Sequence, residues 1–468
     1  MAGITAFGAY LPKFRLTKQT QGWSAPGERT VANFDEDSVT MAVAAGRDCL
    51  AGVRRQSVGG LLFATTTPAY FEKQGASTIA AALDLPRDIF SEDIAGTLRG
   101  GTSALRAAVD AVNGGSAKTV IVAAADCRLA YPKSAMEQSL GDGAAALAIG
   151  DTNVAVEVEA ASFITEHMMD VWRNTEQTYV TTGEDRFIAE EGYLTAMTDA
   201  IASLLKKTRL TPKDFTKAVY YSPDLRRHGD LARRLGFTAN QVQDPLYGKV
   251  GNTGTAFPLM LLVAALETAN PGDRILLAGY GDGADAYSLR VTEHIKKAKR
   301  GRRGIAKHLE TGAPMADYEE FLRWRELLER EPARRPDPQP ISIQASWRDR
   351  ERNLNLHGAR CKSCKRIHYP PQPICGFCQS SDGWDAVRLA DKKGTIVTFS
   401  MDYLAGTTDV PMVIAVVNFA GGGRFLGMLT DREIDAIKVG MPVEMSFRKL
   451  GVIGGIHNYF WKTVPIRS

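Results

Sequence analysis

The sequence has no hydrophobic run long enough to cross a membrane. Apolar runs such as Val120–Ala125 and Val413–Val417 are far shorter than the roughly 20 residues of a transmembrane helix. The first residues, MAGITAFGAYLPKFRL, lack the basic start and long apolar core of a signal peptide. The sequence therefore predicts a cytoplasmic protein with no membrane partner.

The chain also lacks a marked excess of charge of either sign. Its 57 Lys and Arg residues nearly balance its 53 Asp and Glu residues, and the formal net charge of +4 indicates no specific partner. The local exception is Lys296–Arg303, which has six basic residues in eight. Such a run is commonly a solvated linker, and attraction to nucleic-acid or CoA phosphates is the alternative.

Cysteine is scarce, with 6 residues in the chain, and four of them form two CxxC pairs: Cys361 and Cys364, then Cys375 and Cys378. Structural disulfides are not expected in the cytosol. Four thiolates suit a tetrahedral zinc site with bonds of about 2.3 Å. We predict a zinc ribbon or rubredoxin-like site of structural role, because four protein ligands leave no position open for catalysis. Redox-active dithiols, iron in the same sulfur cage and free thiols are the alternatives. Gly376 is expected to ease the second turn.

Short apolar strands alternate with helical segments in the first part of the chain. The expected strands are Ile4–Tyr10, Gly60–Thr65, Thr119–Ala125, Ala218–Tyr221 and Arg274–Gly279, and the expected helices are Ser38–Leu50, Ser77–Leu83, Ile94–Val112, Gly229–Leu235 and Thr255–Thr268. A Gly-Asp-Gly turn at 141–143 and another at 281–283 each lead into a further strand, which indicates an internal repeat. We predict a duplicated α/β fold whose two small-residue helices pack together. Chance recurrence of a common glycine turn is the alternative.

The composition changes near residue 300. Ala316–Glu331 predicts a polar helix, and Pro332–Pro340 predicts a stiff, extended linker. After the cysteine pairs, short strands are expected at Gly394–Phe399, Val413–Phe419, Phe425–Leu429 and Val443–Arg448, typical of an OB-type barrel. The expected domains are 1–295, an α/β domain; 296–340, a basic, helical and proline-rich linker; 341–390, the zinc ribbon; and 391–468, the barrel.

Several motifs give the chain a family resemblance. Residues 1–295 resemble the thiolase superfamily, nearest to hydroxymethylglutaryl-CoA synthases and ketoacyl synthases. The motifs that carry this resemblance are Ala64–Tyr70, Arg99–Leu105, the two glycine turns with their strands, and Val250–Ala256. The C-terminal part resembles the zinc-ribbon plus OB-fold domain that accompanies thiolase-like and acyl-CoA enzymes, through the cysteine pairs, Thr398–Ala405, Asn418–Arg424 and Gly455–Lys462.

The resemblance implies a five-layered αβαβα core, usually dimeric, that binds an acyl-CoA in a tunnel ending at the central helix. Coenzyme A thioesters would be substrates or ligands, and the family chemistry is acyl transfer through a cysteine at the start of that helix. Here the sequence departs from the family pattern. Leu98 occupies the position of the nucleophilic cysteine, Tyr221 that of the histidine and Thr66 that of the glutamate. Asn252 of the GNT motif remains as the candidate catalytic residue.

A leucine cannot attack a thioester, and losing such a nucleophile normally costs several orders of magnitude in rate. No other residue is expected to replace it. Cys49 is expected to be a core residue, Cys127 to lie at the edge of the site or in packing, and His228 to be exposed on a polar helix. Asp142 and Asp282 are expected to shape the glycine turns.

Two functions follow from the resemblance. In the first, the chain is a subunit that works with a catalytic thiolase in cleaving or forming a C–C bond of a β-oxoacyl-CoA. In the second, it is an enzyme in its own right that performs a Claisen or retro-aldol reaction without an acyl-enzyme, with Asn252 and backbone N–H groups near Leu98 and Gly283 stabilising an oxyanion. Single-stranded nucleic-acid binding through barrel aromatics is a minor alternative.

Overall fold

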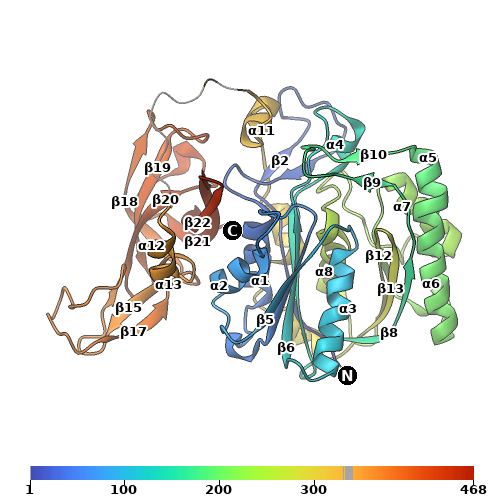
Figure 1. The fold of residues 1–468 in the computed structure, drawn as a ribbon, viewed down its shortest axis with the longest axis horizontal. Coiled ribbons are helices and arrows are strands. Elements are labelled where there is room, and N and C mark those ends of the chain that lie inside the picture. Colours follow the sequence, from blue (N-terminus) through green and yellow to red (C-terminus); the bar gives the residue numbers. More distant parts are fainter. Residues whose placement is uncertain (1, 330, 332–340, 468) are drawn as a thin grey trace. The chain divides into compact units, whose positions relative to one another are not determined.

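The computed structural model describes residues 2–329, 331 and 341–467, which form two compact units (Figure 1). The first unit comprises the residues up to Ala32, Asp37–Ala80 and Leu85–Glu319, and the second comprises Asn33–Glu36, Ala81–Asp84 and the residues from Glu320 onward. The described part of the chain contains no helix of the length and apolarity that a membrane span requires. The predicted linker at 332–340 lies outside the described residues.

The first unit is built on one nine-stranded sheet with the order β11-β12-β13-β8-β1-β7-β6-β4-β5. The strands are β1 (Gly3–Tyr10), β4 (Gly60–Thr65), β5 (Phe90–Ala95), β6 (Thr119–Asp126), β7 (Gly143–Gly150), β8 (Val156–Thr165), β11 (Lys217–Tyr220), β12 (Arg274–Tyr280) and β13 (Gly283–Val291). Their apolar runs form the core of the unit, in which β6 and β7 are almost wholly buried.

The sheet shows the predicted duplication. In the first half, β7 is antiparallel to both β1 and β6, and β6 is parallel to β4. In the second half, β13 is antiparallel to both β8 and β12, and β12 is parallel to β11. The two glycine turns lead into the equivalent strands β7 and β13. The internal repeat and the α/β class predicted from the sequence are therefore confirmed.

The longer helices of this unit are α1 (Ser38–Cys49), α2 (Gly75–Ala82), α3 (Gly100–Asn113), α6 (Thr195–Thr208), α7 (Leu225–Leu235) and α8 (Phe257–Thr268). As predicted, the two small-residue helices α3 and α8 contact each other. A Cβ added to Gly101 would lie 2.5 Å from the carbonyl oxygen of Thr255. Gly101 is therefore required, because any side chain would push the two segments apart.

The shorter elements complete the first unit. They are β2 (Phe14–Leu16), β3 (Arg29–Val31), α4 (Ala135–Ser139), β9 (Val171–Trp172), β10 (Thr181–Thr182), α5 (Asp185–Phe187), α9 (Ile295–Ala298), α10 (Gly304–Glu310) and β14 (Ala313–Pro314). The basic run falls in α9 and the turn after it. Arg302 Nη1 donates to the carbonyl oxygens of Asp48 and Cys49, at 2.6 and 2.7 Å, so part of this run packs within the unit.

Two local expectations need correction. Residues Ile94 and Ala95 belong to strand β5, and the helix begins only at Gly100, because Gly96 turns the chain with a φ of +85°. The helix expected over Ala316–Glu331 is only α11 (Tyr318–Trp324), because Glu326 adopts a left-handed φ of +56° that ends helical geometry.

The second unit contains a ribbon and a barrel. It contains α11 from Glu320 onward, α12 (Ile343–Arg348) and α13 (Arg350–Asn353), and the ribbon strands are β15 (His357–Cys361), β16 (Ile367–His368) and β17 (Trp384–Arg388). The strands β18 (Gly394–Asp402), β19 (Met412–Phe419), β20 (Arg424–Leu429), β21 (Pro442–Ile453) and β22 (Ile456–Pro465) close a barrel in the order β18-β19-β20-β22-β21. Alternate residues, among them Val413, Ala415 and Val417, fill its interior, as expected for an OB-type barrel.

Candidate functional site

A cavity of about 120 Å³ lies in the first unit. It is lined by Thr66, Gly96, Thr97, Leu98, Arg128, Asp170, Val171, Trp172, Arg173, Val180, Gly281 and Asp282. Thr66 follows β4, Arg128 follows β6, and Gly281 follows β12. The carboxyl ends of these strands converge on the cavity, which is where ligands bind in α/β sheets.

Two of the positions predicted from the family pattern meet at this cavity. Leu98, where the family resemblance places the nucleophilic cysteine, is 8% exposed, and Thr66, where the resemblance places the glutamate, lines the same cavity. None of the lining residues is a cysteine or a histidine. Because Leu98 offers only an aliphatic side chain, the described lining provides no sulfur or imidazole for covalent acyl transfer.

Tyr221 and Asn252 also come together, but neither lines the cavity. Asn252 Oδ1 accepts a hydrogen bond from the backbone N–H of Gly254 (2.9 Å), which orients the amide. Its Nδ2 then donates to the Tyr221 hydroxyl (3.1 Å) and to the carbonyl oxygen of Ser222 (3.2 Å). Burial raises the pKa of Tyr221, while the charge of Arg128 and the hydrogen bond from Asn252 act in the opposite direction. A catalytic role for Asn252 stays a prediction.

Asp126 holds the strand ends around the cavity in place. It is fully buried, and its Oδ1 accepts hydrogen bonds from the backbone N–H of Thr66 (2.7 Å) and the hydroxyl of Thr65 (2.9 Å). Its Oδ2 accepts from the backbone N–H and hydroxyl of Thr255, at 2.8 and 3.0 Å. One carboxylate thus links the loop after β4 to the GNT segment before α8.

Asp170 was not predicted from the sequence, although it is the buried carboxyl group of the cavity. It is 7% exposed and accepts hydrogen bonds from the backbone N–H of Val171 (2.6 Å) and from the Tyr280 hydroxyl. Burial raises its pKa, and these hydrogen bonds only partly oppose the shift. A carboxyl group in a small cavity with a raised pKa is suited to general acid–base chemistry. A lone Asp in the segment HMMDVWR carries no signal that could have identified it.

The other cysteines and the histidine considered from the sequence offer no nucleophile or base to this cavity. Cys49 is buried as predicted, and burial raises its pKa to about 12, so its thiol is inert. Cys127 does not line the cavity, and its backbone N–H donates to the Thr67 hydroxyl (3.0 Å). The expectation that His228 is exposed is wrong. It is 5% exposed and stacks on Tyr220, with ring centroids 4.5 Å apart, and burial lowers its pKa to about 4.

The two aspartates of the glycine turns differ. Asp142 is buried, and its Oδ2 accepts a hydrogen bond from the backbone N–H of Ala32 (2.8 Å), in keeping with a structural role. Asp282 adopts a left-handed φ of +50°, as a turn residue can, but it also lines the cavity. The sequence motif indicated the turn and not the cavity.

The four cysteines of the ribbon cluster as predicted. Their sulfur atoms all lie within 4.8 Å of one another, with Cys361–Cys378 and Cys364–Cys375 at 3.7 and 3.5 Å. Zinc–sulfur bonds of about 2.3 Å in a tetrahedron require separations of about 3.8 Å, so the cluster fits zinc. The backbone N–H groups of Cys378 and Phe377 lower the pKa of Cys375 to about 5, which favours the thiolate that a metal binds.

The two cysteine knuckles have the same backbone geometry. Lys365 and Gln379 adopt left-handed φ values of +62° and +54°, and their N–H groups donate to the carbonyl oxygens of Cys361 and Cys375, at 3.0 and 2.9 Å. The expectation that Gly376 eases the second turn is therefore wrong, because the left-handed residue is Gln379. His368 Nε2 lies 3.2 Å from the sulfur of Cys375 and supports the ligand set from outside.

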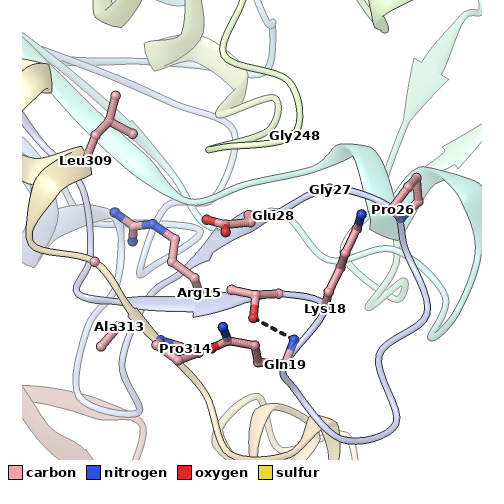
Figure 2. Close-up of a pocket in the computed structure, with 12 residues that line it drawn as sticks. Arg15, Lys18, Gln19, Pro26, Gly27, Glu28, Gly248, Leu309, Ala313 and Pro314 are labelled. Carbon is pink, nitrogen blue, oxygen red and sulfur yellow. Dashed lines mark hydrogen bonds between the residues drawn. The ribbon is translucent and has the colours of Figure 1, made fainter.

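A larger cavity of about 460 Å³ in the first unit contains none of the predicted site residues (Figure 2). Figure 2 shows Arg15, Lys18 and Glu28 among its lining side chains. Arg15 is 3% exposed, and its guanidinium already donates to the carbonyl oxygens of Phe14 (3.0 Å) and His308 (3.3 Å). This cavity mixes charges of both signs and shows no arrangement of chemically reactive groups.

The barrel offers little surface for stacking bases. Of the aromatic residues that motivated the nucleic-acid alternative, Phe419, Phe425, Tyr459 and Trp461 are at most 8% exposed, and Phe460 is half-buried. Tyr403, by contrast, is 63% exposed, and it is distant in the sequence from the buried rings. Stacking requires exposed aromatic faces, so the buried rings serve the core of the barrel.

Three family models match segments of the chain. They describe a ChsH2 rubredoxin-like zinc ribbon domain (residues 350–385), a ChsH2 C-terminal OB-fold domain (386–448) and a 3-oxoacyl-[acyl-carrier-protein] synthase III C terminal (205–292). The hydroxymethylglutaryl-CoA synthase of Aeropyrum pernix is 35% identical over 316 residues, which are 64% of this chain and 87% of that protein. The synthase of Archaeoglobus fulgidus is 30% identical, over 70% of this chain and 99% of its own length.

The chain belongs to the hydroxymethylglutaryl-CoA synthase family. Solved structures agree on the fold: a hydroxymethylglutaryl-CoA synthase complexed with CoA aligns with a TM-score of 0.61 at 18% identity, over 68% of this chain and 89% of that one. A 3-oxoacyl-[acyl-carrier-protein] synthase III from Aquifex aeolicus aligns with a TM-score of 0.56 at 23% identity, over 62% and 100%. The predicted thiolase-like fold with a zinc ribbon and an OB-type barrel is thus confirmed. This member of the synthase family has Leu98 in its cavity.

Proposed function

We propose that the first unit binds a short acyl-CoA thioester and breaks or makes a C–C bond in its acyl group without an acyl-enzyme. The observation that carries this proposal is that Leu98, Asp170 and Arg128 line one cavity. Membership of the synthase family and the relative solved with CoA support an acyl-CoA as the ligand.

In the cleavage direction the ionised Asp170 carboxylate accepts the proton of a hydroxyl group on the β carbon of the acyl chain. The C–O⁻ electron pair forms a carbonyl group, the Cα–Cβ bond breaks, and its electron pair becomes the enolate of the shortened thioester. The protonated Asp170 carboxyl group gives its proton to Cα of that enolate and returns to the ionised form, so no bond between the acyl group and the protein forms at any stage. The reverse sequence forms the same C–C bond.

A second candidate is that the chain is a subunit that binds an acyl-CoA for a catalytic thiolase. The absence of a nucleophile at Leu98 is compatible with it. The buried polar groups of the cavity favour the first candidate, because burying Asp170 and Arg128 costs stability that a passive subunit would not need to sacrifice. The homodimer and the cytoplasmic location stay predictions.

For the second unit we propose one structural zinc ion bound by Cys361, Cys364, Cys375 and Cys378. The separations of the four sulfur atoms support it. The metal would hold the two knuckles together, and four protein ligands leave no position for substrate.

The test of the proposed function is an assay of the isolated chain with short 3-hydroxyacyl-CoA thioesters, in both directions. We expect release of a carbonyl compound and a shorter acyl-CoA in equal amounts, without a thiolase present. Turnover that begins only when a catalytic thiolase is added contradicts this proposal and supports the second candidate. Chromatography of the CoA thioesters and of the carbonyl product measures both outcomes.

A further inference from the structure

Arg128 is the buried cation of the smaller cavity. It is 5% exposed, whereas Arg173, the other arginine of the lining, is exposed and donates to the carbonyl oxygen of Thr66 (2.9 Å). Asp170 lines the same cavity, and Asp126 lies two positions earlier in the chain. These two carboxyl groups supply the negative charge that lets a guanidinium group stay in the interior.

The side chain of Arg128 packs closely against the GNT segment. A Cβ added to Gly254 would lie 3.0 Å from Cδ of Arg128 and closer still to the Asp126 carboxylate. Gly254 also adopts a left-handed φ of +62°. Glycine at this position therefore leaves room for the Arg128 side chain beside the Asp126 carboxylate.

A chain of hydrogen bonds leads from the same segment to the guanidinium group. The backbone N–H of Gly254 donates to Asn252 Oδ1 (2.9 Å), so the Asn252 amide is oriented with its Nδ2 donating to the Tyr221 hydroxyl (3.1 Å). Arg128 forms a hydrogen bond with the same hydroxyl, and Arg128 is the donor because a guanidinium has no acceptor.

The chain of hydrogen bonds reaches the cavity only through Arg128. Tyr221 and Asn252 are 3% and 2% exposed, and neither lines the cavity. These two residues, at the positions that the family resemblance gives to a catalytic histidine and asparagine, are therefore placed to hold Arg128.

We propose that Arg128 donates hydrogen bonds to the thioester oxygen of the acyl-CoA as it becomes the enolate oxygen, and that Tyr221 is the positioning residue that orients Arg128. This inference rests on the proposed function. A guanidinium is a rigid planar fork of five N–H groups, so a bond from one of them to Tyr221 sets the direction of the others. A donor that is already oriented in a buried site stabilises a developing oxyanion without reorganising.

The charges balance through the cleavage step. The ionised Asp170 takes the proton of the β-hydroxyl group and becomes neutral. The Cα–Cβ electron pair then moves into the thioester, and the negative charge appears on the enolate oxygen. The proton returns from Asp170 to Cα, which restores both groups. One negative charge thus moves between Asp170 and the enolate within the cavity that Arg128 lines.

The test is a double-mutant cycle on the full chain, with whichever short 3-hydroxyacyl-CoA thioester the wild-type protein cleaves fastest. Arg128→Gln is expected to lower kcat by about 10²- to 10³-fold, the cost of losing one oxyanion donor, with little change in KM. Tyr221→Phe keeps the ring and is expected to lower kcat by about 10- to 100-fold, as misplacement of a catalytic group does. In the Arg128→Gln background Tyr221→Phe should cause no further loss, because its effect passes through Arg128.

A second readout follows enolate formation without cleavage. In D₂O the wild-type protein should exchange the Cα hydrogens of acetyl-CoA for deuterium, and the variants should lose this exchange in the same pattern. Arg128→Lys keeps the charge but lacks the planar fork, and it is expected to retain no more than about a tenth of kcat. This variant tests the inference even if Tyr221→Phe does not fold.

Tyr220→Phe is the matched control. Tyr220 precedes Tyr221 in the chain and is fully buried, and its hydroxyl donates to the carbonyl oxygen of His228 (2.9 Å). This variant loses a buried hydroxyl of the same kind away from Arg128 and is expected to keep the wild-type kcat.

Three results overturn the inference and leave cleavage without an acyl-enzyme in place. They are a wild-type kcat in Tyr221→Phe or Arg128→Lys, an equal loss from Tyr221→Phe in both backgrounds, and a loss in Tyr220→Phe as large as that in Tyr221→Phe. A merely structural role of Tyr221 would give the second result. If the wild-type chain neither cleaves a 3-hydroxyacyl-CoA nor exchanges acetyl-CoA, the proposed function itself is contradicted.

Discussion

Replacement of Cys361 by serine is expected to abolish zinc binding and unfold the ribbon. The ribbon has only three short strands, β15, β16 and β17, so it depends on the metal for its stability. Zinc contributes about 10–16 kcal/mol to the folding of comparable small modules, far more than such strands provide. The measurement is metal content by mass spectrometry, combined with limited proteolysis of residues 350–385.

Cys127→Ser is the control for this change. It makes the same substitution at a cysteine outside the cluster and is expected to keep one zinc ion per chain and a protected ribbon. A Cys361→Ser variant that still binds one zinc ion and resists protease would contradict the structural role. Iron in place of zinc in wild-type protein would contradict the choice of metal.

Replacement of Asp170 by asparagine is expected to lower kcat by about 10²- to 10⁴-fold, the contribution of a positioned general base. The amide retains the shape of the side chain but cannot accept the substrate proton. Binding of the acyl-CoA should change little, so the loss should fall on kcat and not on KM. Asp199→Asn on the exposed face of α6 is the control, with activity unchanged.

The pH dependence of kcat/KM distinguishes the loss of a general base from a variant that only destabilises the fold. Burial raises the pKa of Asp170, so the acid limb of kcat/KM should lie above the range of an ordinary carboxyl group. The Tyr280 hydroxyl stabilises the ionised form by a hydrogen bond. Tyr280→Phe should therefore raise the pKa further and move the acid limb to higher pH. An unchanged limb, or an Asp170→Asn variant at the wild-type rate, would contradict the assignment of the base.

The ribbon and the duplicated sheet could be predicted because their determinants are local. The spacing of Cys361, Cys364, Cys375 and Cys378 limits where the four sulfurs can lie, and each glycine turn lies next to the strand that it starts. The apolar run that forms β6 predicted a strand covered on both faces, although the sequence did not show which strands pair with it.

The cavity could be predicted only in part. The family pattern identified Leu98 and Thr66, but Thr97, Arg128 and Asp170 come from three separate segments that the fold brings together. Nothing near Asp170 in the sequence distinguishes it from an exposed aspartate. His228 was misjudged because most residues of α7 are polar, although His228 lies with Leu231 and Ala232 among the buried residues of that helix.

In the proposed mechanism no covalent bond forms between the protein and the acyl group during turnover. The direct measurement is the intact mass of the chain, quenched in acid while it turns over its acyl-CoA substrate. We predict the mass of the unmodified chain at every time point, with product accumulating. A mass increase equal to the acyl group, mapped to Thr66 or Thr97 of the cavity or to Cys127, would contradict this mechanism.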